Sequence, residues 1–213
     1  MLVLVYALNE SKWSNRTFIN YIEMLPICFR ERILRFSNWQ DAQASLLGKL
    51  LLKHILLTYQ SKYTLDDINI ASTGRPYIND KFDFNITHSG SYVVCAYFDE
   101  GKVGVDIEII KQIDIKDFKE SFTEKEFRSI KSSTEVYKSF YALWTIKEAS
   151  IKADGRGLII PLKNVEVQDG NVLIQNTKWF YKEVLFKSDY ILHIATDKLI
   201  LPSVSLSEIR YMS

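Results

Sequence analysis

The segment 144–158 constrains the fold most, because it predicts a helix with a defined end and a defined polar face. Apolar residues and strong helix formers run through it without Gly or Pro until Gly155, a residue typical of a helix C-terminus. Trp144, Glu148 and Lys152 follow one another at steps of four, so a helix presents all three on one face. Taken alone, the pattern also fits an ordinary surface pair of Glu and Lys.

Residues 103–109 alternate strictly and predict a β-strand with one apolar and one polar face. The polar face carries Asp106 and Glu108 side by side. Adjacent like charges on a strand are unfavourable unless solvent or a cation compensates them. Carboxylate oxygens suit Mg²⁺, which binds through one or two carboxylates together with substrate phosphates. Asp106, Glu108 and Glu148 would together form such a half-built site.

These two segments contain a pair of motifs with a known counterpart. The motifs are Gly104-Val105-Asp106-Ile107-Glu108 and Trp144-x-x-Lys147-Glu148-Ala149-x-x-Lys152-x-x-Gly155-x-Gly157-Leu158. They resemble the signatures of the 4'-phosphopantetheinyl transferases, in particular the surfactin-synthetase-activating type, in which one chain contains two similar halves. Three further segments match that subfamily in the same order: Asp41-Ala42 with Leu46-Leu47-Gly48, Gly74-Arg75-Pro76, and residues 84–90.

The resemblance implies an α+β fold of pseudo-twofold symmetry, in which each half packs a long helix on a small, mainly antiparallel sheet. The order of expected elements agrees, since each half runs from a strand through short helices to a long apolar helix and then further strands. We place an N-terminal half that binds coenzyme A at residues 1–103 and a C-terminal half with the metal site and signature helix at 104–213. We also expect a strand over 65–70, an alternating strand over 81–86 with residues 82, 84 and 86 on one apolar face, and a hairpin at 99–102 that leads into the carboxylate strand. Thr123 and Glu126 have the pattern of a capping box at the start of a helix.

The reaction implied by the resemblance is Mg²⁺-dependent transfer of 4'-phosphopantetheine from coenzyme A to a serine of an apo acyl or peptidyl carrier protein, which releases adenosine 3',5'-bisphosphate. Pyrophosphate cleavage requires neutralisation of negative charge. By resemblance, Asp106, Glu108 and Glu148 hold the metal, and Glu148 and Lys152 are catalytic, with Glu148 the first candidate for the base that activates the serine. The coenzyme A contacts implied are Arg32, Arg75, Pro76, His88, Ser89 and Lys152.

The chain departs from the subfamily pattern where relatives hold the 3'-phosphate. The positions that are basic in those relatives are Phe29 and Ala44 here. Nearby cations that could compensate are Arg30, Arg32, Arg35, Lys49 and Lys53. We therefore expect weaker discrimination between coenzyme A and 3'-dephospho-coenzyme A than in a fully basic relative.

Net charge and sequence patterns exclude several other classes of function. The net charge of +1 gives no whole-protein attraction to nucleic acid or membrane, and residues 1–8 have the pattern of a strand and not of a signal peptide. We therefore expect a cytoplasmic monomer whose partner is an acidic carrier protein, docked on residues 116–131 unless the aromatic residues there are core. A non-catalytic coenzyme A or carrier-binding protein of the same fold is the alternative. A nucleotide kinase would need a Gly-rich phosphate loop, which the sequence lacks.

Overall fold

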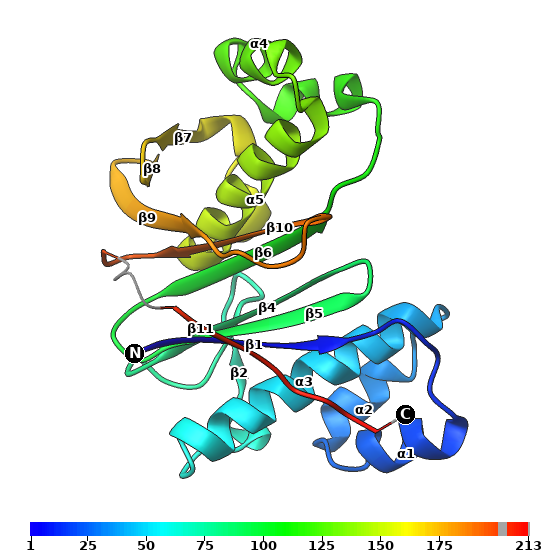
Figure 1. Ribbon diagram of the computed structural model, residues 1–213. Coiled ribbons are helices and arrows are strands. Elements are labelled where there is room, and N and C mark those ends of the chain that lie inside the picture. The colour runs from blue at the N-terminus through cyan, green and yellow to red at the C-terminus, as the bar shows by residue number, and fades with distance from the viewer. Residues whose placement is uncertain (200–203, 213) are drawn as a thin grey trace.

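The computed structural model describes residues 1–199 and 204–212 and divides them between two sheets that lie side by side (Figure 1). Residues 200–203 and 213, which belong to the expected second half, lie outside the described residues. The first sheet has the strand order β11-β1-β5-β4 and the second the order β6-β10-β9-β8-β7, while β2 and β3 form a small separate pair. Neighbouring strands are antiparallel except β1 and β11, which pair in parallel.

The helices and strands have the following bounds. The strands are β1 Leu2–Leu8, β2 Asn69–Ile70, β3 Pro76–Tyr77, β4 Asp83–Ser89, β5 Tyr92–Phe98, β6 Val103–Ile109, β7 Val165–Gln168, β8 Asn171–Ile174, β9 Thr177–Glu183, β10 Tyr190–Thr196 and β11 Ser205–Glu208. The α-helices are α1 Asn15–Ile22, α2 Ile27–Ile33, α3 Trp39–Tyr59, α4 Glu124–Ser132 and α5 Val136–Asp154. The 3-10 turns are η1 Leu65–Asp67, η2 Ile115–Ser121, η3 Gly157–Ile159 and η4 Leu162–Asn164.

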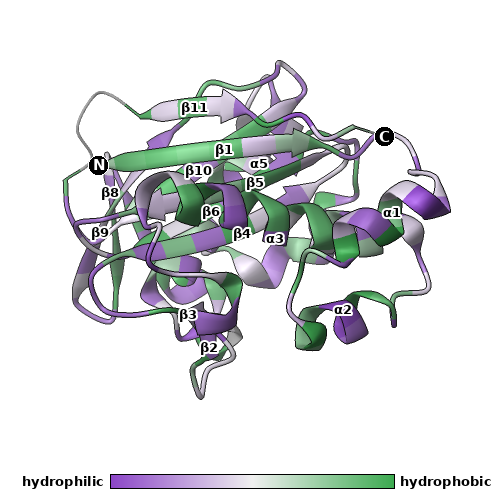
Figure 2. Ribbon diagram, turned by 90° about the horizontal axis from the view of Figure 1, so that it is seen from below, coloured by the Kyte–Doolittle hydropathy of each residue, from purple (hydrophilic) through white to green (hydrophobic). Residues whose placement is uncertain are grey.

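Each sheet is covered by one long apolar helix, as the α+β expectation requires. Helix α3 buries Leu46, Leu47 and Leu51 against the first sheet, and Figure 2 colours the hydrophobic residues along this helix green. Helix α5 buries Ala149 and Ala153 against the second sheet. The opposite faces of both sheets share one apolar layer, which contains side chains from β1, β5, β6 and β10: Leu4, Val94, Ala96, Val103, Val105, Ile107, Leu192 and Ile194.

The two sheets meet along β4 and β6, a region we call the seam. The bonds across the seam join side chains of β4 to backbone N–H groups of β6. Asp83 Oδ2 accepts from Val103 N at 2.9 Å, Asn85 Oδ1 from Val105 N at 3.0 Å and Ser89 Oγ from Ile109 N at 3.2 Å. The three bonds share one offset along the chain, so β4 and β6 run alongside each other in register. The seam thereby fixes how the two halves are placed.

Two of the expected strand features are wrong. Residues 65–67 form η1 because Thr64 and Asp67 make a reciprocal capping box, which leaves only Asn69 and Ile70 to pair in β2. The turn at 99–102 is not a β-hairpin between paired neighbours, since β5 pairs with β1 and β4 while β6 pairs with β10. Lys102 N donates instead to Asp197 Oδ1 at 2.8 Å, at the end of β10.

The C-terminal strand β11 crosses back to the first sheet, where residues 205–208 pair with residues 3–6 of β1. Beyond it, Tyr211 packs on Trp13 and Tyr21 at the start of the chain. The chain beyond residue 204 therefore contacts the N-terminal half. The division of the chain at residues 103 and 104 remains a prediction.

Candidate active site

Strand β6 holds the two expected carboxylates at the seam. Asp106 is buried, with 4% of its surface exposed, whereas Glu108 is half-buried. Gly104 on the same strand lets α5 approach closely, because a Cβ there would lie 2.0 Å from the carbonyl oxygen of Ala149 and 2.4 Å from Ala153 N. This close approach brings the polar face of α5 over the carboxylates.

Helix α5 presents Trp144, Glu148 and Lys152 along one face, as the spacing predicted, and ends at Gly155 in the left-handed region with φ 84°. Lys152 Nζ donates to Asp106 Oδ1 at 2.5 Å and to Val105 O and Thr87 Oγ1 at 3.3 Å each. The indole of Trp144 packs on Phe140 and Phe118, with ring centroids 5.8 and 5.5 Å away. These aromatic contacts fix the end of the polar face that is farthest from Lys152.

A hollow of about 350 Å³ is lined by these groups: Ile86, Thr87, His88, Asp106, Glu108, Trp144, Glu148 and Lys152. A second hollow of about 570 Å³ shares Ile86 and His88 with it and extends over α2 and α3. Arg32, Lys49, Gly74 and Pro76 are among its lining residues. Because they share Ile86 and His88, the two hollows adjoin each other at the seam. We call them the catalytic hollow and the outer hollow, and together the groove.

The three carboxylates at the catalytic hollow carry more negative charge than Lys152 alone can balance. Burial raises the pKa of Asp106, and the charge of Lys152 opposes that rise. Burial also raises the pKa of Glu108, against a hydrogen bond from Ser89, and the pKa of Glu148, to which the charge of Asp106 adds. The shared direction of the shifts indicates a site that gains by taking up positive charge.

The donor set partly fits the expected magnesium ion. No three His, Cys, Asp or Glu side chains in residues 1–199 and 204–212 are grouped as a ready metal site. Asp106 Oδ1 is bonded to Lys152, but Asp106 Oδ2 is buried without a hydrogen-bond partner among these residues. An orphaned carboxylate oxygen beside two further carboxylates is the oxygen chemistry that Mg²⁺ requires. The residues present are therefore of the type that binds Mg²⁺, although they are not already grouped around a common point.

The expected coenzyme A residues fall into two groups. His88 lines both hollows, and Arg32 and Pro76 line the outer one. Arg75 and Ser89 instead make contacts within the seam. Arg75 Nη2 donates to Asp83 at 2.5 Å and to Val103 O at 2.8 Å, and Ser89 Oγ donates to Glu108 Oε2 at 2.6 Å.

Lys147, which precedes Glu148 on α5, is fully buried and connects this helix to α4 and η4. Its ammonium pairs with Glu126 at 2.8 Å and donates to Leu162 O at 3.1 Å. Glu126 also completes the capping box that Thr123 was expected to make at the start of α4. The signature helix is thus tied to α4 and η4.

Sequence reasoning missed the polar face of β4. Residues 82, 84 and 86 were assigned to the apolar face, but the alternate positions Asp83, Asn85, Thr87 and Ser89 all contact β6 or its neighbours. The signal was present in the same alternation, as a run of short polar side chains. The alternation alone did not reveal which strand would lie opposite them.

Comparisons with known proteins match both halves of the chain to one family. Residues 102–195 match the model of the 4'-phosphopantetheinyl transferase superfamily, and residues 11–99 match that of the 4'-phosphopantetheinyl transferase N-terminal region. The chain is 37% identical over 176 residues to 4'-phosphopantetheinyl transferase Sfp of Bacillus subtilis, which covers 78% of this chain and 75% of the relative.

Relatives from two other organisms give the same result. The 4'-phosphopantetheinyl transferase gsp of Aneurinibacillus migulanus is 37% identical over 146 residues, 63% of this chain and 58% of that protein. The L-aminoadipate-semialdehyde dehydrogenase-phosphopantetheinyl transferase of Xenopus laevis is 30% identical over 179 residues, 75% of this chain and 59% of that protein. Fold and site thus define a group-transfer enzyme with a carboxylate-rich centre. The chain belongs to the 4'-phosphopantetheinyl transferase family, of the type represented by Sfp.

Proposed function

We propose that this enzyme transfers 4'-phosphopantetheine from coenzyme A to a serine hydroxyl of an apo carrier protein and releases adenosine 3',5'-bisphosphate. The observation that carries the proposal is the pair of adjoining hollows at the seam, with Arg32 and Lys49 at the outer hollow and carboxylates with Lys152 at the catalytic hollow. Coenzyme A has phosphates at two separated places. The outer hollow offers Arg32 and Lys49, and the catalytic hollow offers Lys152 together with carboxylates that would hold a cation. The pyrophosphate would lie at Lys152 and the nucleotide end toward Arg32.

The chain's own residues account for most of the chemistry. Lys152 has a half-buried ammonium that can donate to the pyrophosphate oxygens as charge develops on them. Asp106, Glu108 and Glu148 would hold Mg²⁺, which when bound supplies Lewis-acid charge to the same oxygens. Ser89 orients Glu108 through its 2.6 Å hydrogen bond.

Glu148 is the proposed base for the carrier serine, because its half-buried carboxylate lines the groove on the helix face that α5 presents there. Glu148→Gln keeps the shape of the side chain and removes its basicity. We expect turnover to fall by at least about 100-fold with little change in coenzyme A binding. Single-turnover kinetics with calorimetry separates the two effects, and a variant of near-normal rate would remove Glu148 from the mechanism.

Two of the candidate cations reach the outer hollow, where a phosphate would lie beside Phe29 and Ala44. They are Arg32 and Lys49, and Lys49 Nζ lies 5.2 Å from the centre of the Phe29 ring. Burial lowers the pKa of Lys49, and the positive charge of Arg32 lowers it further, against an opposing influence of Cys95. Two cations close enough to repel each other are a favourable site for a phosphate dianion.

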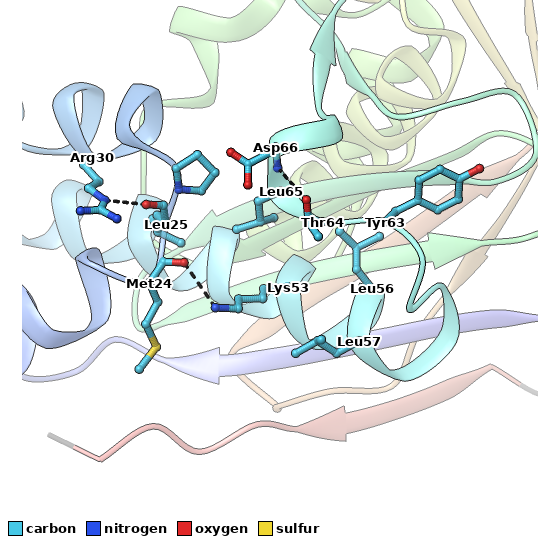
Figure 3. A pocket seen from close by; sticks show the side chains of 11 residues that line it. Met24, Leu25, Arg30, Lys53, Leu56, Leu57, Tyr63, Thr64, Leu65 and Asp66 are labelled. Atoms are coloured by element: carbon cyan, nitrogen blue, oxygen red, sulfur yellow. Dashed lines mark hydrogen bonds between the residues drawn. The ribbon is translucent and has the colours of Figure 1, made fainter.

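Two of the other candidate cations, Arg30 and Lys53, donate to backbone carbonyls instead. Arg30 Nε donates to Leu25 O at 2.5 Å and Lys53 Nζ to Met24 O at 3.3 Å (Figure 3). Both line a separate hollow of about 420 Å³ that does not include Arg32 or Lys49. We therefore assign the nucleotide phosphate to Arg32 and Lys49 and not to Arg30 or Lys53.

The carrier protein is proposed to dock beside η2 and α4. Phe122 and Phe127 belong to the core, so the aromatic part of the expected surface is structural, whereas Lys125 and Arg128 are exposed. Charge reversal at Lys125 and Arg128 should raise the Michaelis constant for an acidic carrier by about 10-fold and leave that for coenzyme A unchanged. An unchanged carrier constant would contradict this docking surface.

The decisive experiment incubates the protein with an apo carrier, coenzyme A and Mg²⁺ and measures the intact mass of the carrier. A gain of about 340 Da, absent without metal, is the expected outcome of phosphopantetheine transfer. Coenzyme A binding without a mass gain on acyl and peptidyl carriers alike would favour the non-catalytic alternative.

No helix among the described residues is long and apolar enough to span a membrane. Monomeric state and action in the cytoplasm remain predictions.

A further inference from the structure

Thr87 is a seam residue whose hydroxyl contacts both Asp106 and Lys152, whereas the hydroxyl of Ser89 contacts Glu108. Its neighbours Asn85 and Ser89 accept hydrogen bonds from backbone N–H groups of β6, whereas Thr87 Oγ1 donates to Asp106 Oδ1 at 3.3 Å and accepts from Lys152 Nζ at 3.3 Å. Asp106 and Lys152 are themselves 2.5 Å apart, so the three groups form a closed triangle. Thr87 is 5% exposed, which makes these contacts part of the interior.

A hydroxyl suits this position for a chemical reason. Asp106 can only accept and the Lys152 ammonium can only donate, while a hydroxyl does both through one proton and its lone pairs. The directions of both bonds are therefore fixed by the charges of the partners. A threonine is also β-branched and restricted at χ1, so the oxygen has little freedom to leave the triangle.

The triangle determines which atoms remain available to a ligand. Asp106 Oδ1 is engaged by Thr87 and Lys152, which leaves Oδ2, the buried oxygen without a partner among the described residues. Lys152 comes from α5 in the second half, and Thr87 comes from β4 in the first. The hydroxyl thus connects the placement of the halves to the orientation of the two charged groups.

We propose that Thr87 is a positioning residue that holds the Asp106 carboxylate and the Lys152 ammonium in their working orientation from across the seam. The proposal rests on the roles proposed above for Asp106 and Lys152. Thr87 itself need not contact a reacting atom. Its effect is expected on the rate of the chemical step more than on coenzyme A binding.

The test compares Thr87→Val, which removes the hydroxyl but keeps the branched shape, with Thr87→Ser, which keeps the hydroxyl. Hydrogen bonds to charged groups are strong enough that we expect Thr87→Val to lower kcat by about 10- to 100-fold. The Michaelis constant for coenzyme A should change by less than about 3-fold, and Thr87→Ser should restore kcat to within about 3-fold of the wild type. Thr196→Val is the matched control, because Thr196 is also buried in a strand and, within the part of the chain that the structure describes, its hydroxyl bonds only to Lys198 O.

A second comparison asks whether Thr87 acts through Lys152. Thr87→Val should add little to the loss caused by Lys152→Met, because the hydroxyl has then lost the ammonium that it holds. A double variant as slow as the product of both single effects would overturn the proposal, as would a wild-type kcat in Thr87→Val.

A spectroscopic measurement needs no turnover. In protein labelled with ¹⁵N-lysine, the Lys152 ammonium resonance, assigned by its loss in Lys152→Met, should shift in Thr87→Val and stay unchanged in Thr196→Val. An unmoved resonance would refute the positioning role even if the enzyme were inactive on every carrier tried. If the wild type transfers nothing to any carrier but the resonance still shifts in Thr87→Val, the proposed function is refuted and the contact between Thr87 and Lys152 is established.

Discussion

Replacement of Gly104 by alanine tests the closest contact in the active site. The new Cβ would lie 2.0 Å from Ala149 O and 2.4 Å from Ala153 N, whereas ordinary van der Waals contact begins at 3.4 Å. Both atoms are backbone atoms of α5, so no side-chain rotation can relieve the clash. The strand and helix would have to separate by more than an ångström at this point.

The magnitude follows from two opposing effects. Overpacking by one methyl group in a dense core costs about 1–3 kcal/mol, and rigid backbone neighbours place Gly104→Ala at the upper end. Reduced freedom of the unfolded chain returns about 0.4–1 kcal/mol. We expect the free energy of unfolding to fall by about 2–3 kcal/mol. Because Asp106 and Lys152 lie on the two separating elements, kcat should fall by about 100-fold in the protein that remains folded.

Urea denaturation and transfer kinetics on the same samples measure both effects. Gly48→Ala is the comparison variant, since the nearest atom to its Cβ would be a side-chain methyl, Ile86 Cγ2 at 2.8 Å, which is farther away than the backbone atoms that Gly104→Ala would meet. Alanine is also the better helix former, so Gly48→Ala should stay within about 1 kcal/mol of the wild type. A Gly104→Ala protein with wild-type stability and turnover would show that α5 and β6 are not closely packed.

Two further predictions concern a ligand and pH. Lys49→Gln should reduce the preference for coenzyme A over 3'-dephospho-coenzyme A, in kcat/KM, by about 10-fold, because a charged contact to the phosphate is lost; Lys53→Gln is the control, and equal effects would contradict the assignment. His193 is buried and bonded to Thr145 Oγ1 at 2.8 Å, and burial lowers its pKa to about 4. The unfolded state therefore binds more protons between pH 6.5 and 4, so acid should lower the free energy of unfolding by up to about 3 kcal/mol. As the pH falls through this range, the urea midpoint of His193→Gln should fall less steeply than that of the wild type. Parallel profiles of the two proteins would show that His193 does not cause the acid sensitivity.

The sequence predicted the parts of the site that local patterns encode. The α5 face and the β6 alternation depend on residues close together in the chain, and both are confirmed. The capping box at Thr123 is confirmed for the same reason. Local turn chemistry at Thr64 defeated the strand expected over 65–70, because capping by Asp67 outweighs the apolar pattern.

Long-range placement accounts for what the sequence could not provide. The partner of β6 is β10, far along the chain, so the turn at 99–102 gave a misleading signal. The contacts of Arg75 and Ser89 within the seam depend on β4 lying beside β6, which alternation does not specify. The position of Lys49 on the outer hollow likewise depends on how α2 and α3 pack.

The return of β11 to the first sheet has a consequence for dividing the chain into separate pieces. A cut within the turn at 99–102 would leave β1 in one fragment and its parallel neighbour β11 in the other. The N-terminal fragment would then expose an unpaired edge of the apolar strand β1, which is a template for aggregation. The two fragments should accumulate as folded, unaggregated proteins only when they are produced together, so that β11 can pair again with β1. Co-production could therefore reconstitute the enzyme from two polypeptides, with restored activity as a readout of their association.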